Sequence, residues 1–180
     1  EYGYISNWDT SLVTDMSNLF MNKLTFNDDI SKWNTSSVTN MVGMFLGSPV
    51  FNQDIATKDV SGLDGSTYTA WDTILVTDMG TMFRLAEGFN KSISNWKTSE
   101  VTDMNHMFAH PNNFNQYIGD WDTSNVVDMS HMFKGCTDFN QDISGWNVSK
   151  VTNMSHMFEG CTIFNKDIST WLNDPNGVIN

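Results

Sequence analysis

The chain has 180 residues and a formal net charge of −12 at pH 7, from 21 acidic and 9 basic residues. This balance excludes nucleic-acid binding by phosphate neutralisation and makes an anionic membrane surface an unfavourable partner. No apolar run reaches the roughly 18–20 residues that a membrane-spanning helix needs, so this segment is not expected to insert into a membrane.

A period of 25 residues runs along almost the whole chain, with one longer gap of 38 residues between Trp33 and Trp71. A fixed period of this length is typical of solenoids, propellers and arrays. We expect a single solenoid of about six repeats in residues 1–172, with 173–180 as a tail or the start of another segment. The tryptophans that mark the period are Trp8, Trp33, Trp71, Trp96, Trp121, Trp146 and Trp171.

The other large apolar residues also occupy fixed columns of the repeat. Because one unit cannot enclose its own apolar side, stacked units are expected to cover one another and to form one continuous core. These columns therefore predict a core and not a cofactor site. They include Phe20, Phe45, Phe83, Phe108, Phe133 and Phe158; Phe26, Phe51, Phe89, Phe114, Phe139 and Phe164; and parallel series of Met, Val and Ile that begin at Met16, Val13 and Ile30.

The first residues read as the end of a repeat, because Tyr4-Ile5-Ser6-Asn7-Trp8 aligns with Tyr117-Ile118-Gly119-Asp120-Trp121. We therefore expect the chain to be a piece of a longer protein or a mature form.

Within a unit, the segments "SNVVDM" (124–129) and "SKVTNM" (149–154) predict strands of three or four residues that stack in parallel, roughly 4.8 Å apart. The segment "DMSHMFKG" (128–135) predicts one or two turns of α- or 3₁₀-helix between a capping Asp128 and Gly135. "DISGW" (142–146) predicts a second short strand or bridge. Overall, regular secondary structure should be low.

Thirteen extra residues lie within 56–70, a segment rich in Gly, Ser and Thr. The columns resume at Trp71, so the core should continue beneath the insertion. Its larger apolar residues, Val60, Leu63 and Tyr68, are too few to build a second core. We expect a surface bulge that is more mobile than its neighbours.

The repeat W-[DN]-T-S-x-V-T-[DN]-M-x-x-M-F-x-G-C-x-x-F-N-x-D-I-S-x-W resembles the BspA-like leucine-rich-repeat surface proteins from Ile5 to Trp171. The resemblance implies a leucine-rich-repeat-like parallel β coil, an extracellular or cell-surface location, a role in adhesion or recognition, and no catalytic residues. The insertion and the last residues depart from the pattern.

Asparagine follows the second Phe column in every unit, and we expect its amides to bond to the backbone of the same and adjacent coils. Asp78, Asp103 and Asp128 belong to an Asp/Asn column that favours structural capping, with Ca²⁺ binding as the alternative. No other cofactor is expected. The asparagines are Asn27, Asn52, Asn90, Asn115, Asn140 and Asn165.

His106, His131 and His156 share one column on three successive units. Aligned imidazoles can bind Zn²⁺ or Ni²⁺, but an exposed row without that function is the simpler interpretation. Cys136 and Cys161 also share a column, and neighbouring units would bring them within disulfide reach. Buried free thiols are the alternative, and the sequence leaves both open.

No GxSxG, HExxH, GxxxxGK[ST] or paired CxxC motif occurs, so we expect no enzymatic activity. We expect a recognition or adhesion module that binds a protein or glycan through one solenoid face, where the most variable columns lie. Alternatives are a calcium-binding solenoid, an ice-binding solenoid with threonine ladders, or a targeting repeat of a larger enzyme. The candidate binding residues are Leu12, Ser37, Leu75, Glu100, Asn125 and Lys150 in one column, and Arg84, Lys134 and Glu159 in the other.

Overall fold

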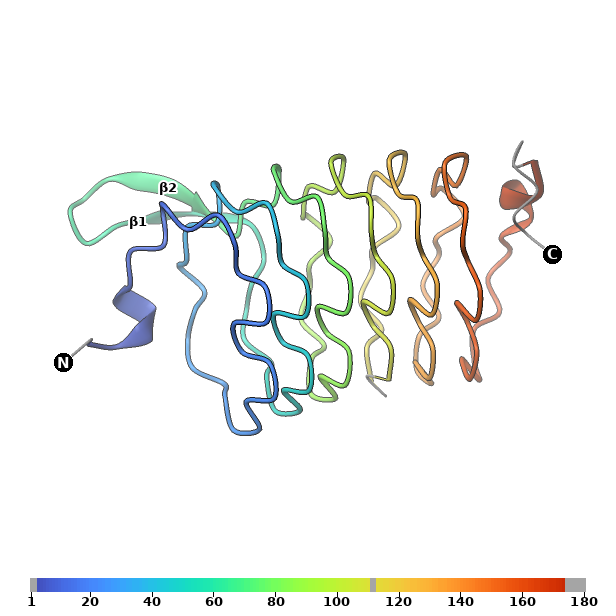
Figure 1. Ribbon diagram of the computed structural model, residues 1–180, viewed down its shortest axis with the longest axis horizontal. Helices are drawn as coiled ribbons and strands as arrows, with labels where there is room; N and C mark the ends of the chain where they lie inside the picture. The colour runs from blue at the N-terminus through green and yellow to red at the C-terminus, as the bar shows by residue number, and fades with distance from the viewer. Residues whose placement is uncertain (1–2, 111–112, 174–180) are drawn as a thin grey trace.

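The computed structural model describes residues 3–110 and 113–173, which wind into successive coils that lie side by side along the long axis (Figure 1). One residue of each coil forms a parallel bridge with its equivalent in the next, and the bridges continue in register from Asn40 to Asp78 past the insertion. The bridged residues are Asp15, Asn40, Asp78, Asp103, Asp128 and Asn153. The coils are numbered here from 1 to 6 as residues 8–32, 33–70, 71–95, 96–120, 121–145 and 146–170.

Regular secondary structure in the described ranges consists of two short 3₁₀ helices, η1 (Ile5–Asn7) and η2 (Ser169–Asn173), and two strands, β1 (Lys58–Ser61) and β2 (Thr67–Ala70). Strands of three or four residues are predicted within 124–129 and 149–154, and this length is wrong. Each segment contains only one bridged residue, Asp128 or Asn153. Turns on both sides of that residue explain the difference. In coil 2, for example, Val38 N donates to Thr35 O at 2.9 Å and Met44 N donates to Met41 O at 3.2 Å.

The helix predicted at 128–135 is also wrong, since this segment is a run of turns. His131 and Gly135 have φ of 56° and 73°, and these left-handed residues turn alternate amides toward the next coil. The carbonyls of coil 6 thus take the place of the acceptors that a helix would supply from its own chain. The amides of Met129, His131, Phe133 and Gly135 donate to Asn153, Ser155, Met157 and Glu159 at 2.9, 2.9, 3.0 and 2.7 Å.

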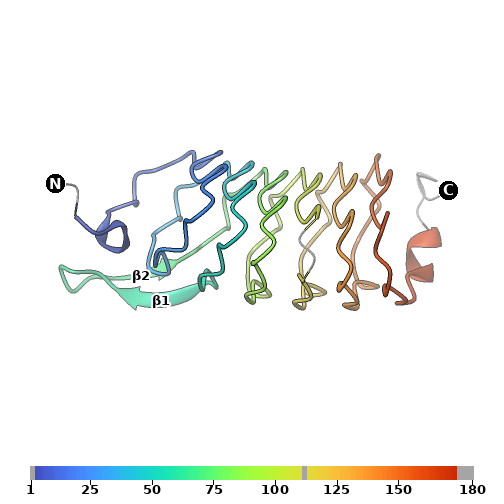
Figure 2. The ribbon, with the colours of Figure 1, turned by 90° about the horizontal axis from the view of Figure 1, so that it is seen from below.

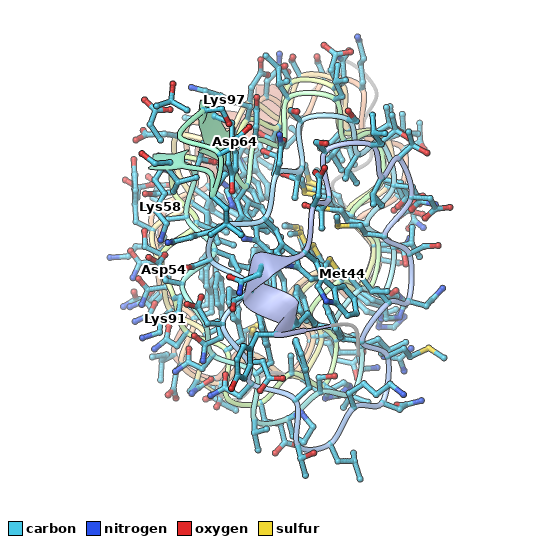
Figure 3. All side chains as sticks on the ribbon, turned by 90° about the vertical axis from the view of Figure 1, so that its left-hand side faces the viewer. Met44, Asp54, Lys58, Asp64, Lys91 and Lys97 are labelled. Carbon is cyan, nitrogen blue, oxygen red and sulfur yellow. The ribbon has the colours of Figure 1, made fainter. Side chains whose placement is uncertain are left out.

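The predicted core columns are confirmed as the interior of the stack. Phe83, Phe108 and Phe133 are completely buried, and their rings stack from coil to coil with centroids 5.6 and 5.8 Å apart. Figure 3 looks along the stack and shows Met44 inside it, whereas Asp54 lies at the outer edge. Each coil therefore covers the apolar side of its neighbour, which a single 25-residue unit could not do alone.

The indoles of Trp33, Trp71, Trp96, Trp121 and Trp146 donate hydrogen bonds to carbonyls of earlier coils or of η1, whereas the buried Nε1 of Trp171 has no partner among the described residues. The Trp96 Nε1–H donates to Ile55 O at 2.9 Å, and the Trp121 Nε1–H donates to Ile93 O at 3.1 Å. The asparagine ladder is confirmed as well, since Asn115 N donates to Asn90 Oδ1 at 3.2 Å. This bond recurs between adjacent coils, with the amides of Asn52, Asn90, Asn140 and Asn165 donating to Asn27, Asn52, Asn115 and Asn140.

The insertion forms an antiparallel hairpin of β1 and β2, in register from Lys58↔Ala70 to Ser61↔Thr67. The hairpin runs along one side of the stack and extends past coil 1 (Figure 2). Val60 and Tyr68 pack against the core, and the Tyr68 hydroxyl donates to Lys32 O at 2.5 Å. The insertion is thus a more regular element than the bulge expected from its composition, with Val60 of β1 and Tyr68 and Ala70 of β2 packed against the stack.

Candidate functional site

The first candidate column, called here the strand-side row, comprises Leu12, Ser37, Leu75, Glu100, Asn125 and Lys150. The structure brings these residues onto equivalent positions of successive coils. Leu12 is 90% exposed and Leu75 is 47% exposed. At the other end of the row, Lys150 Nζ donates to Asn125 Oδ1 at 2.5 Å, and Asn125 Nδ2 donates to Ser99 O at 2.7 Å. The row therefore changes from apolar to charged and amide groups along the stack.

A threonine column borders the strand-side row and is exposed, but its hydroxyls are engaged by the backbone. Thr77 Oγ1 donates to Thr39 O and Thr102 Oγ1 donates to Thr77 O, both at 3.2 Å. The other threonine column is buried, so it cannot form a second surface ladder of the kind that the ice-binding alternative would use. Its members are Thr10, Thr35, Thr73, Thr98 and Thr123.

The side chains of the Asp/Asn column accept hydrogen bonds within local turns of the backbone. Asp103 Oδ1 accepts from the backbone N of Asn105 at 2.8 Å, and Asp128 Oδ1 accepts from the backbone N of Ser130 at 2.7 Å. These are Asx turns and not helix N-caps, because no helix follows. Burial raises the pKa of Asp78, which accepts from Gly80 N at 2.9 Å. Across the described residues, no group of three or more His, Cys, Asp or Glu side chains is arranged to hold a metal ion.

The three histidines of the candidate metal column stack face to face. The ring centroids of His106 and His131 are 4.3 Å apart, and those of His131 and His156 are 4.8 Å apart. Imidazole lone pairs lie in the ring planes, so face-to-face stacking does not favour coordination of one shared ion, and a row without metal stays the simpler interpretation. Burial, followed by the neighbouring histidine, lowers the pKa of His106 and of His131.

The second candidate column lies beside the histidines. Lys134 Nζ and His156 Nδ1 both contact Glu159 Oε2, at 3.0 and 2.8 Å. Arg84 occupies the equivalent position of coil 3, and its Nε is buried without a hydrogen-bond partner in the described structure. Sequence reasoning treated the histidines and this column separately. Their contact follows from the four-residue run of turns, in which His156 and Glu159 face the same side.

Cys136 and Cys161 are free thiols. Cys136 Sγ donates to Phe108 O at 3.2 Å, and Cys161 Sγ donates to Phe133 O at 2.9 Å. Burial raises the pKa of Cys136, and it raises that of Cys161 to about 11. Neither thiol is therefore activated as a nucleophile at neutral pH.

A cavity of about 440 Å³ opens between coil 1 and the hairpin, with Trp8, Asp9, Lys32, Asp64 and Tyr68 among its lining residues. No sequence motif indicates this cavity, because it depends on where the inserted hairpin folds back.

Comparison with known families gives two matches. The family described as "Mycoplasma protein of unknown function, DUF285" matches residues 2–65 and again residues 62–171. No curated protein and no solved structure matches the chain. No helix of the described part of the chain is long and apolar enough to cross a membrane. The two family matches, like the stacked columns, extend over most of the sequence, and the chain therefore belongs to the DUF285 family.

Proposed function

We propose that this chain is a non-enzymatic recognition module of a secreted or surface-exposed protein, built as a leucine-rich-repeat-like solenoid of the BspA-like kind. The periodic core and the bridges between coils support that architecture. DUF285 repeats also occur in BspA-like surface proteins, which supports the location and the adhesive role.

The strand-side row is the proposed contact surface for a protein or glycan partner. The single observation that carries this proposal is the contrast between constant and variable columns. The phenylalanine, valine and isoleucine columns of the core repeat the same residue type in every coil, while the row presents Leu12, Leu75, Glu100 and Lys150 on one exposed side. Solenoids use such stacked rows as extended binding surfaces.

Exposed apolar side chains on this side favour a protein partner or the apolar face of a sugar. Leu12 and Leu75 belong to the row itself, and Ile74 and Val127 beside it are 48% and 42% exposed. Clustered exposed apolar residues with a polar surround are typical of interaction sites. Nucleic acid and membrane lipid are unsuitable partners for this row, because it holds one anionic and one cationic side chain, Glu100 and Lys150, and no cluster of cations.

Charge reversal in the row tests the proposal. The chain is applied to an array of glycans and a panel of purified extracellular proteins, and the variant Glu100→Lys/Lys150→Glu is compared with the unmodified protein. The expected result is binding to at least one probe and an approximately tenfold loss of affinity in the variant. Lys91→Gln is the control, because glutamine occupies the same column at Gln53, Gln116 and Gln141. Unchanged affinity in the double variant, or no binding at all, would contradict the proposal.

A further inference from the structure

A second surface of the stack gathers basic side chains in a protein that is otherwise strongly acidic. This surface, called here the histidine row, consists of Arg84, His106, His131, Lys134 and His156. It spans coils 3 to 6. The stacked rings, 4.3 and 4.8 Å apart, set a spacing of one imidazole per coil. The row is distinct from the strand-side row, which lies on the other side of the bridged residues in the chain.

Arg84 is the part of the row that lacks a counter-charge. No ion pair or side-chain hydrogen bond to its guanidinium occurs within residues 3–110 and 113–173, and its buried Nε has no acceptor. Arginine is rarely removed from water unless it is paired. In a chain with 21 acidic residues, this half-buried guanidinium has no partner among the described residues and is available to an acceptor from outside the chain.

The opposite end of the row already holds an anion. The Glu159 carboxylate contacts Lys134 Nζ at 3.0 Å and His156 Nδ1 at 2.8 Å. A lysine and a histidine of adjacent coils thus form a carboxylate site. The equivalent column position in coil 4 is Ala109, which supplies no charge, so Arg84 and His106 have no comparable internal carboxylate.

We propose that the histidine row binds an anionic polysaccharide through its carboxylate or sulfate groups, and that it binds this ligand more tightly below neutral pH. A chain polymer suits a site whose basic side chains recur once per coil, with imidazole rings 4.3 and 4.8 Å apart that become cationic as pH falls. A folded protein partner suits it less well, because such interfaces are anchored by apolar and aromatic residues. Leu85, which is 40% exposed, is the large exposed apolar residue next to the row.

The dependence on pH follows from the groups that face each ring. His106 faces His131, Arg84, Lys134 and Asp128. His131 faces His156, Lys134, Glu159 and Asp128. In the free protein, burial and the adjacent imidazole disfavour protonation of His106 and His131. A bound anion would offset that repulsion, so binding takes up protons and affinity rises as pH falls.

The experiment measures the affinity of three probes at pH 7.5 and pH 5.5: a heparin oligosaccharide for sulfate, an oligogalacturonate for carboxylate, and neutral dextran. The affinity for the anionic probes should be higher at pH 5.5 than at pH 7.5. The expected increase in affinity is about tenfold for each proton taken up on binding and each unit of pH. Arg84→Gln should weaken binding about tenfold. Glu159→Gln should strengthen it, because it removes the carboxylate that competes for Lys134 and His156.

Three variants make the outcome decisive. His106→Asn/His131→Asn/His156→Asn should fold, because Asn18 occupies the same slot at a φ of 57°, and it should abolish the pH dependence. Lys91→Gln and Glu100→Lys/Lys150→Glu should leave polysaccharide binding unchanged. A failure of the histidine-row proposal can therefore be told apart from a failure of the strand-side proposal. The proposal is overturned by binding to dextran, by pH-independent affinity, by equal binding of a single-stranded oligonucleotide, or by Arg84→Gln having no effect.

Discussion

Two residues in each repeat have a positive φ, four positions apart, and this restricts which side chains the repeat accepts. The first slot holds Asn, Gly or His in most coils, and these residues adopt the left-handed region at lower cost than others. Thr81 and Leu85 are exceptions, at φ of 56° and 60°. The row of histidines is therefore compatible with the backbone, and asparagine is the conservative replacement. The first slot comprises Asn18, Gly43, Thr81, His106, His131 and His156; the second comprises Asn22, Gly47, Leu85, His110, Gly135 and Gly160.

Stability should fall as the histidine stack is protonated. Burial and the neighbouring ring lower the pKa of His106 and His131 below the ordinary value of 6.5. The unfolded chain therefore binds protons first, and the stabilising difference is complete above pH 6.5 and is lost as pH falls below it. The urea midpoint should decrease from pH 7.5 to pH 5.5. His106→Asn/His131→Asn should flatten this decrease, and an equally steep decrease in that variant would contradict the assignment.

The hairpin is an element added to an intact coil, so its deletion should be tolerated. We predict that removing 58–70, which joins Thr57 to Trp71, changes the free energy of unfolding by about 1 kcal/mol. The deletion loses the packing of Val60 and Tyr68 and of the completely buried Ala70. It also lets Trp71, which has a φ of 51° and donates to Trp33 O at 3.1 Å, return to the turn of the other coils. In the other coils, the backbone N–H of the tryptophan donates to the carbonyl of the residue three positions earlier, as Trp96 N does to Ile93 O at 3.2 Å.

Chemical denaturation with and without the hairpin measures this difference, and Tyr68→Phe isolates the bond from its hydroxyl to Lys32 O. Loss of cooperative unfolding in the deletion variant would mean that the core of coils 1 to 3 depends on the hairpin and would contradict the prediction.

Columns of large apolar residues were sufficient to predict the buried interior, because burial depends on residue type and period. The local path was harder to predict. "DMSHMFKG" has the capping residue and terminal glycine of a short helix, but its amides find acceptors in the next coil. The sequence feature that could have predicted these turns is the column of His131. Other coils have Asn or Gly at this position, and both residue types favour a positive φ. The meeting of His156 with Glu159 depends on that same turn, and the cavity beside Trp8 depends on how the hairpin folds back.

At the scale of the whole molecule, the apolar packing of each coil is against its neighbours, and the tryptophan indoles also reach carbonyls two coils back, as Trp96 does to Ile55. Stability is therefore close to a sum of coil and interface contributions. Coils 2 to 5 are covered on both sides, and their phenylalanines are buried. Phe26, Phe158 and Phe164 lie in coils 1 and 6 and are only half-buried. A Phe→Ala substitution should therefore reduce the free energy of unfolding by different amounts in different coils.

We predict that Phe108→Ala costs about 3–5 kcal/mol of unfolding free energy, whereas Phe164→Ala costs about 1–2 kcal/mol. Phe108 is completely buried and stacks on Phe83, Phe114 and Phe133, with centroids 5.6, 4.0 and 5.8 Å away. Phe164 contacts Phe158 and Phe139 at 4.3 and 5.9 Å. Hydrogen exchange should show lost protection in coils 3 to 5 for the first variant and in coil 6 for the second. Equal costs, or uniform loss of protection in both, would indicate that the chain unfolds as one unit and that nearest-neighbour addition does not describe it.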